Sequence, residues 1–226
     1  MVVAKYAITT QHGVIEGRIL RKIAKRKGSE PFMSKIWILM GKSATGKDTI
    51  FKMLKEQTEV PLHTIVPYTT RPIREGEREG VEYHFVTEEE YLLQKEAGKI
   101  IEQRAYETVH GLWRYFTVKD SQWDLEHHDY IMINTLEGYE QVRAYFGDDV
   151  VKPIYITVED GERLTRALER EKQQKMPKYK ELCRRYLADE EDFSQEKLEA
   201  AGITCVYENC DSVECVKQII EEIEVV

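Results

Sequence analysis

Residues 37–55 are Trp-Ile-Leu-Met-Gly-Lys-Ser-Ala-Thr-Gly-Lys-Asp-Thr-Ile-Phe-Lys-Met-Leu-Lys, and this stretch decides the fold. An apolar run stops at Gly41, four residues lead to Gly46 and Lys47, and apolar residues then recur with helical spacing. This is the phosphate-loop pattern in its strand–loop–helix setting. Backbone N–H groups of such a loop surround phosphate oxygens, and the helix N-terminus adds partial positive charge. The sequence therefore predicts a binding site for a nucleoside triphosphate.

Lys47 is the cation that the pattern directs at the β- and γ-phosphates. The next position departs from the pattern, because Asp48 stands where a Ser or Thr hydroxyl normally binds Mg²⁺. A carboxylate also binds Mg²⁺, but an anion in a first helical turn is favoured by electrostatics alone, so both interpretations stay open. We expect Mg²⁺ near Asp48 and Thr49. The triphosphate-binding set is Gly41, Lys42, Ser43, Ala44, Thr45, Gly46, Lys47, Asp48 and Thr49.

Composition limits the class of protein. The chain has 226 residues, a net charge of −8, 42% hydrophobic and 33% charged residues. This length fits one α/β domain with a small inserted subdomain. The negative charge argues against general nucleic-acid affinity, and no apolar run approaches the about 20 residues that span a bilayer. The four cysteines lack paired spacing, which favours free thiols. We expect a cytoplasmic protein that binds neither nucleic acid nor membrane, and the oligomeric state stays open.

The first 32 residues differ in charge from the rest, with seven Lys or Arg against two Glu. They lack the apolar segment of a secretory signal, whereas a transit peptide stays open. Met33 just precedes the first predicted strand, so an over-long start is an alternative. We expect 1–32 to be a disordered or peripheral basic extension and 33–226 to form the domain.

Apolar patterns predict alternating elements along the chain. Around the phosphate loop, this order favours a P-loop NTPase-type α/β fold, a parallel sheet with helices on both faces. The predicted strands are 62–68, 81–86, 100–107, 113–118, 130–134, 150–158 and 203–207. The predicted helices are 47–57, 87–97, 139–145, 162–191 with an interruption at 176–177, and 212–223.

A second loop indicates a particular family more specifically than the phosphate loop does. Its sequence, Thr69-Thr70-Arg71-x-x-Arg74-x-Gly76-Glu77-x-x-Gly80-x-x-Tyr83-x-Phe85, resembles the monophosphate segment of the guanylate kinase family. The resemblance runs from about 36 to 222 and implies a small monophosphate-binding subdomain at about 67–120 and a helical lid at about 162–190. It also implies that Arg71, Arg74 and Tyr83 clamp the acceptor phosphate. Independently of the resemblance, two planar guanidinium groups beside a tyrosine hydroxyl are suited to bind a dianionic phosphate.

Further residues follow from the same resemblance. Glu102 matches the family glutamate that accepts hydrogen bonds from the N1–H and amino group of guanine. Tyr115 and Thr117 match a tyrosine on phosphate and a hydroxyl on the base, although the preceding spacing is about four residues longer than usual. The family's lid arginines, which neutralise the transferring phosphoryl group, match Arg166, Arg170, Arg184 and Arg185. Asn209 matches an asparagine near adenine.

The resemblance implies ATP-dependent phosphorylation of GMP or dGMP with Mg²⁺, and three departures bear on it. Pro67 replaces a serine that contacts the monophosphate, and residues 131–138 lack the two carboxylates of an Asp-x-Asp-x-Gln-Gly pattern, one of them at Thr135. A kinase of this fold for another phosphorylated acceptor, such as a sugar bisphosphate, is an alternative. Glu102 and Thr117 discriminate, because only a base needs them. A non-catalytic binding module is a second alternative, disfavoured by the intact Gly41, Gly46 and Lys47.

Overall fold

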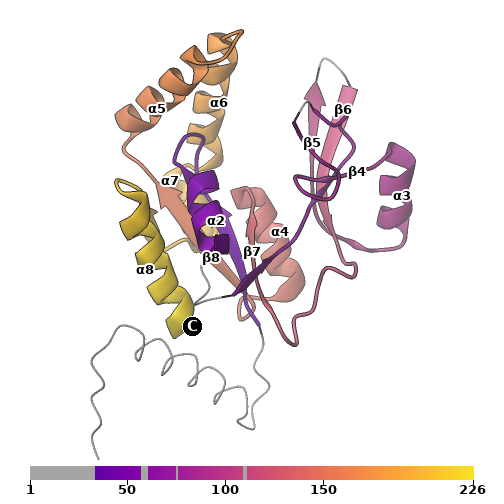
Figure 1. Cartoon of the computed structure of the whole chain (residues 1–226). Helices are drawn as coiled ribbons and strands as arrows, with labels where there is room; N and C mark the ends of the chain where they lie inside the picture. Colours follow the sequence, from indigo (N-terminus) through magenta and orange to yellow (C-terminus); the bar gives the residue numbers. More distant parts are fainter. Residues whose placement is uncertain (1–33, 57–60, 75, 109–110) are drawn as a thin grey trace, which may run out of the picture.

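A five-stranded parallel sheet forms the centre of the molecule (Figure 1). The computed structural model describes residues 34–56, 61–74, 76–108 and 111–226, so the predicted extension lies outside the described residues. Every neighbouring pair of strands in this sheet is parallel, as predicted. In spatial order the strands are β2 (Leu62–Thr64), β7 (Asp129–Ile133), β1 (Ile36–Met40), β8 (Val151–Thr157) and β9 (Val206–Glu208).

Helices cover both faces of this sheet, which confirms the predicted fold class. Trp37 and Leu39 pack with α2 (Lys47–Glu56) and α8 (Ser212–Val225) on one face. Ile36, Ile38 and Met40 pack with α4 (Leu136–Phe146) on the other. Strand β1 is buried throughout because both of its faces are covered, as is usual in parallel sheets.

A second, smaller sheet carries strands β3 (Tyr68–Thr69), β4 (His84–Phe85), β5 (Ile100–Thr108) and β6 (Gly111–Val118), in the order β4-β3-β6-β5. Helix α3 (Glu88–Glu96) packs on it through Tyr91, which contacts Phe116. The helix begins at the predicted place, because Thr87 and Glu90 form a capping box. This small sheet lies within the region that the sequence assigned to a subdomain.

Three predicted strands are wrong in extent. The segment 62–68 splits between β2 of the large sheet and β3 of the small one, because the chain crosses from one sheet to the other at 65–67. The segment 81–86 contains only β4, since 80–82 form a turn in which Gly80 has a φ of 71°. The last predicted strand also begins later, at Val206, and a short helix, α7 (Gln195–Ala200), was not predicted.

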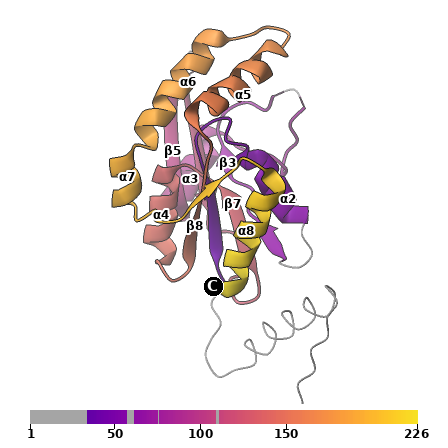
Figure 2. The ribbon, with the colours of Figure 1, turned by 90° about the vertical axis from the view of Figure 1, so that its left-hand side faces the viewer.

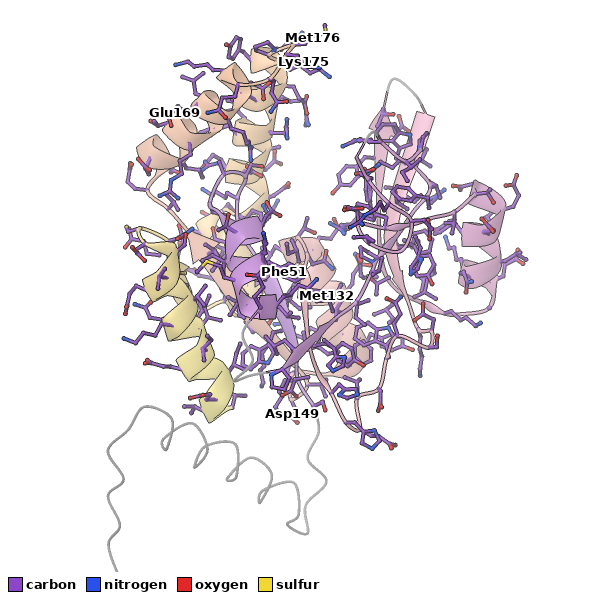
Figure 3. All side chains as sticks on the ribbon, viewed as in Figure 1. Phe51, Met132, Asp149, Glu169, Lys175 and Met176 are labelled. Carbon is purple, nitrogen blue, oxygen red and sulfur yellow. The ribbon has the colours of Figure 1, made fainter. Side chains whose placement is uncertain are left out.

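Helices α5 (Asp160–Lys172) and α6 (Tyr179–Asp192) form a helical hairpin in the region predicted as a lid. The break between them contains Met176 and Pro177, as predicted, and Lys175 and Met176 lie at its exposed end (Figure 3). The helical hairpin and the small sheet rise on either side of the edge where the parallel strands end (Figures 1 and 2). In open parallel sheets this carboxyl edge is where ligands bind. No helix within the described residues is both long and apolar enough to cross a bilayer.

Candidate active site

The loop between β1 and α2 folds tightly against the sheet. The Oγ1 of Thr45 donates to the carbonyl of Lys42 at 2.9 Å. A Cβ on Gly41 would lie 2.6 Å from the carbonyl oxygen of Ile156, and one on Gly46 would lie 2.4 Å from Nδ2 of Asn209. Gly46 also has a φ of 85°. Both glycines of the phosphate-loop pattern are therefore required by space, and Gly46 by its backbone conformation as well.

The side chain of Asn209 supports the phosphate loop through a hydrogen bond. Its buried side chain donates from Nδ2 to the carbonyl of Thr45 at 2.8 Å, and its Oδ1 accepts from the hydroxyl of Ser212 at 3.0 Å. Nη2 of Arg166 donates to the backbone carbonyl of Asn209 at 3.3 Å. Asn209 thus joins the end of β9 to the phosphate loop, while its expected contact with adenine stays a prediction.

A cleft of about 270 Å³ opens beside the loop. It brings together two predicted lid arginines and the two residues predicted to bind Mg²⁺. Among the described residues, no group of three or more potential metal ligands gathers. Mg²⁺ typically takes one or two carboxylates together with substrate phosphates and water, so the exposed Asp48 fits such a site without a preformed cage. The cleft is lined by Ala44, Gly46, Asp48, Thr49, Arg166 and Arg170.

The other two predicted lid arginines lie farther along α6. Arg184 pairs with Glu181 through two hydrogen bonds of 2.7 and 2.9 Å and is exposed. Arg185 lies 3.4 Å from the same carboxylate. It also lines, with Arg170 and Ser43, a small cavity between the helical hairpin and the loop. Arg166, Arg170 and Arg185 therefore line spaces that loop residues also line, whereas Arg184 is exposed and paired with Glu181.

A buried charge cluster joins the helical hairpin to the loop, and the sequence analysis missed it. The side chain of Arg163 is 1% exposed, pairs with Asp160, Asp189 and Glu190, and stacks on Tyr186 with its Cζ 3.9 Å from the ring centroid. Because charged residues at helical spacing normally indicate a solvated face, no signal in the sequence separates this cluster from an ordinary surface.

The same carboxylates reach the loop directly. Oδ2 of Asp189 accepts from the backbone N–H of Ser43 at 2.8 Å. Oε2 of Glu190 accepts from Nζ of Lys42 at 2.7 Å. The first half of the phosphate loop is therefore held by α6, whereas its second half is held by Asn209.

On the other side of the sheet edge, Arg71 is buried and rigidly held. Its two terminal nitrogens donate to Glu77 at 2.7 and 2.6 Å, and this pairing lowers the pKa of Glu77 to about 2. The guanidinium also lies over the ring of Tyr83, at 5.0 Å from its centroid. The rings of Tyr83 and Tyr115 are 5.6 Å apart, and burial raises the pKa of Tyr83. Three residues expected at the acceptor phosphate therefore cluster.

Arg74 lies in a different environment from the buried Arg71. Its side chain is exposed, and its guanidinium lies 5.9 Å from the ring centroid of Trp113 on β6. Its backbone N–H donates to Glu77 at 2.9 Å, so Glu77 organises the segment that carries both arginines. The shared grip of Arg71 and Arg74 on one phosphate stays a prediction.

The predicted base-binding residues face each other across the hairpin of β5 and β6. Glu102 is paired with Thr117 in the strand register, and the hydroxyl of Thr117 donates to Oε1 of Glu102 at 2.8 Å. Oε2 of Glu102 makes no hydrogen bond within the described residues, and Nε of Arg104 lies 3.4 Å from it. Arg104 was not predicted, although a residue two positions from Glu102 on a strand shares its face.

Two polar contacts connect the small sheet to the large one. Backbone N–H and carbonyl groups of Gln103 bond with the side chain of Gln141 on α4, at 3.0 and 3.1 Å. Nη1 of Arg104 lies 3.5 Å from Oγ1 of Thr135. Thr135, which stands where the family pattern has an aspartate, caps α4 by accepting from the N–H of Gly138. The missing carboxylate is thus replaced by a helix-capping hydroxyl.

A phosphate loop at the carboxyl edge of a parallel sheet, between a helical hairpin and a small second sheet, defines a P-loop nucleotide-binding protein. The family model described as "Guanylate kinase" matches residues 33–196. The chain belongs to the guanylate kinase family.

Similar proteins agree with this assignment. The chain is 33% identical over 135 residues to the guanylate kinase of Helicobacter hepaticus, covering 59% of this chain and 64% of that relative. It is 36% identical over 126 residues to the guanylate kinase of Acinetobacter baylyi, covering 54% and 56%. The matched parts thus span less than two thirds of these relatives. A guanylate kinase structure from Anaplasma phagocytophilum has the same fold, with a TM-score of 0.61, 22% identity and coverage of 85% and 86%.

Proposed function

We propose that this protein is an ATP-dependent kinase that converts GMP or dGMP to the diphosphate. The observation that carries the proposal is the pairing of Glu102 with Thr117 on one side of the sheet edge that holds the phosphate loop. A loop for a triphosphate and a carboxylate for a base together fit transfer between two nucleotides. A cytoplasmic location, where both nucleotides are available, belongs to the same proposal.

In this reaction the bond between the γ-phosphorus of ATP and its bridging oxygen breaks, and a bond to a phosphate oxygen of the acceptor forms. The products are ADP and the nucleoside diphosphate. Catalysis rests on position and charge neutralisation. Lys47 balances charge on the β- and γ-phosphates, and Arg166 and Arg170 border the cleft where the transferred group passes. Asp48 and Thr49 would hold Mg²⁺, which would supply further neutralisation of the phosphates.

The acceptor phosphate binds at Arg71, Tyr83 and Tyr115. The pairing of Arg71 with Glu77 fixes the guanidinium before any ligand arrives. Its stacking on Tyr83 restrains it further, so less conformational entropy is lost on binding.

The test is a panel of acceptors with ATP and Mg²⁺, followed by coupled detection of ADP. GMP and dGMP should release ADP faster than CMP, UMP or AMP, and chelation of Mg²⁺ should abolish the release. If ADP release does not depend on any monophosphate, the kinase proposal is wrong and a binding module becomes the better description.

Lys47→Ala should lower turnover by at least about 100-fold, the scale of a lost transition-state contact, and leave the circular dichroism spectrum unchanged. Lys52→Ala, an exposed lysine on the same helix, is the matched control and should keep normal turnover. Near-normal phosphoryl transfer by the Lys47 variant would contradict the proposed role of the loop.

A further inference from the structure

One face of the β5–β6 hairpin carries an unusual pair of charges. Glu102 and Arg104 are two residues apart on β5, so their side chains project to the same side. Thr117 and Tyr115 oppose them on β6. This face therefore joins the residues expected at the base to those expected at the acceptor phosphate.

Glu102 and Arg104 are both largely buried, so each charge needs compensation within the protein. The side chain of Glu102 is 0% exposed and that of Arg104 is 16% exposed. An ionised carboxylate away from water requires a compensating charge, and Arg104 supplies it. However, Nε of Arg104 and Oε2 of Glu102 form no hydrogen bond to each other or elsewhere in the described chain. A buried donor and a buried acceptor thus lie side by side as an ion pair at 3.4 Å, each with unused hydrogen-bonding capacity that a ligand could satisfy.

An adjacent donor and acceptor match an adjacent acceptor and donor on a base. Resting on the proposed function, we propose that Arg104 and Glu102 together bind the C6=O and N1–H groups of a 6-oxopurine, Arg104 donating to O6 and Glu102 accepting from N1–H. The acceptor class is then 6-oxopurine monophosphates, with IMP included beside GMP. Adenine presents an amino group at C6 and an unprotonated N1. Its amino donor would face the donor Arg104, and its N1 acceptor would face the acceptor Glu102.

The site offers few free hydrogen-bond acceptors to the 2-amino group, which distinguishes guanine from hypoxanthine. Oε1 of Glu102 already accepts from Thr117. The hydroxyl of Thr135 accepts from Gly138, and Oδ1 of Asn134 accepts from the N–H of Thr135. Each of these three oxygens thus already accepts one hydrogen bond from the protein, and the carboxylate of the family pattern is absent at Thr135. The 2-amino group should add little to binding.

The first experiment compares kcat/KM for GMP, IMP and AMP with ATP held saturating. GMP and IMP should agree within about tenfold, the scale of one neutral hydrogen bond, and AMP should be at least about 100-fold poorer. If GMP is phosphorylated and IMP is poorer by more than about 100-fold, this inference fails while the proposed function stands. If neither GMP nor IMP is phosphorylated, both this inference and the proposed function fail.

The second experiment alters the donor. Arg104→Met should raise KM for GMP and IMP together by at least about tenfold, with KM for ATP changed by less than about twofold. Arg104→Lys, which keeps a donor, should recover part of the loss. The matched control is Arg114→Met, because Arg114 pairs with Glu88 and stacks on Tyr91, away from Glu102. Equal losses toward ATP and both acceptors would show a purely structural role and overturn the inference.

The third experiment restores the missing carboxylate and does not depend on removing a buried charge. Aspartate caps helices as threonine does, so Thr135→Asp should preserve α4. A carboxylate there offers the 2-amino group an acceptor and should raise the ratio of kcat/KM for GMP over IMP by at least about tenfold. An unchanged ratio, in a variant that is folded and active on GMP, would overturn the inference.

Discussion

At the scale of single residues, the most unusual backbone is that of Ala44 in the phosphate loop. Its φ is 66°, and among the described residues every other positive φ belongs to glycine. The left-handed conformation costs a non-glycine residue about 1–2 kcal/mol. Its neighbour Ser43 is held by Asp189, so tertiary contacts maintain a conformation that alanine alone does not favour.

Replacement of this residue tests that strain. Ala44→Gly removes the steric penalty but adds freedom to the unfolded chain, so it should stabilise the protein by up to about 1 kcal/mol. Urea denaturation measures the change. The reverse control, Gly46→Ala, should destabilise strongly, because φ is 85° and Asn209 leaves no space. A clear loss of stability in Ala44→Gly would contradict the strain argument.

Glu77 carries a pH-dependent part of the stability. Because Arg71 lowers its pKa to about 2 from the ordinary 4.5, the folded state holds the ionised form more strongly than the unfolded state does. This contribution is complete above pH 4.5 and declines as pH falls from there toward 2. Glu77→Gln should therefore reduce the free energy of unfolding at pH 7 by more than it does at pH 3.5. A gap that widens on acidification would show that Arg71 does not hold this carboxylate.

At the scale of elements, α6 and the phosphate loop form one unit. Asp189→Ala leaves the N–H of Ser43 without its acceptor and removes one of the three carboxylates that surround the buried Arg163. KM for ATP should rise by about tenfold, the scale of one charge-assisted hydrogen bond, while KM for the acceptor changes less. Steady-state kinetics with each substrate varied in turn measures both. The exposed Asp192 at the end of the same helix is the control, and an Asp192→Ala variant with the same ATP defect would refute a specific role for Asp189.

The sequence predicted those elements whose signals are local. The strand before the loop, the capping box of Thr87 and Glu90, and the break at Pro177 all depend on neighbouring residues. The split of 62–68 depends on a chain crossing between two sheets, which no local pattern encodes. At the site, the resemblance predicted that Glu102 and Thr117 contact a base, which stays a prediction, and the structure shows that the two side chains bond to each other. The cluster around Arg163 remained hidden, because a buried and a solvated charged helix have similar sequences.

At the scale of the whole molecule, two projecting parts attach to one sheet edge by different means. The helical hairpin is joined to the loop through Asp189 and Glu190, which are charged groups. The small sheet is joined to α4 through Gln141 and Gln103, which are neutral amides, and through Ile101, which packs in the same core cluster as Leu136 and Tyr139. Salt screens exposed charges and has little effect on amide pairs. The pair of Lys42 with Glu190, whose side chain is 38% exposed, is therefore open to screening by salt, whereas the buried cluster around Arg163 is screened much less.

The hydrogen bond from Asn209 to Thr45 joins residues that lie 164 positions apart. During synthesis the phosphate loop is made together with β1 and α2, but the amide that supports the loop is made only 164 residues after Thr45. A nascent chain that stops short of residue 209 carries the entire nucleotide motif without its support. The order of translation thus defers a finished nucleotide pocket until residue 209 has been made.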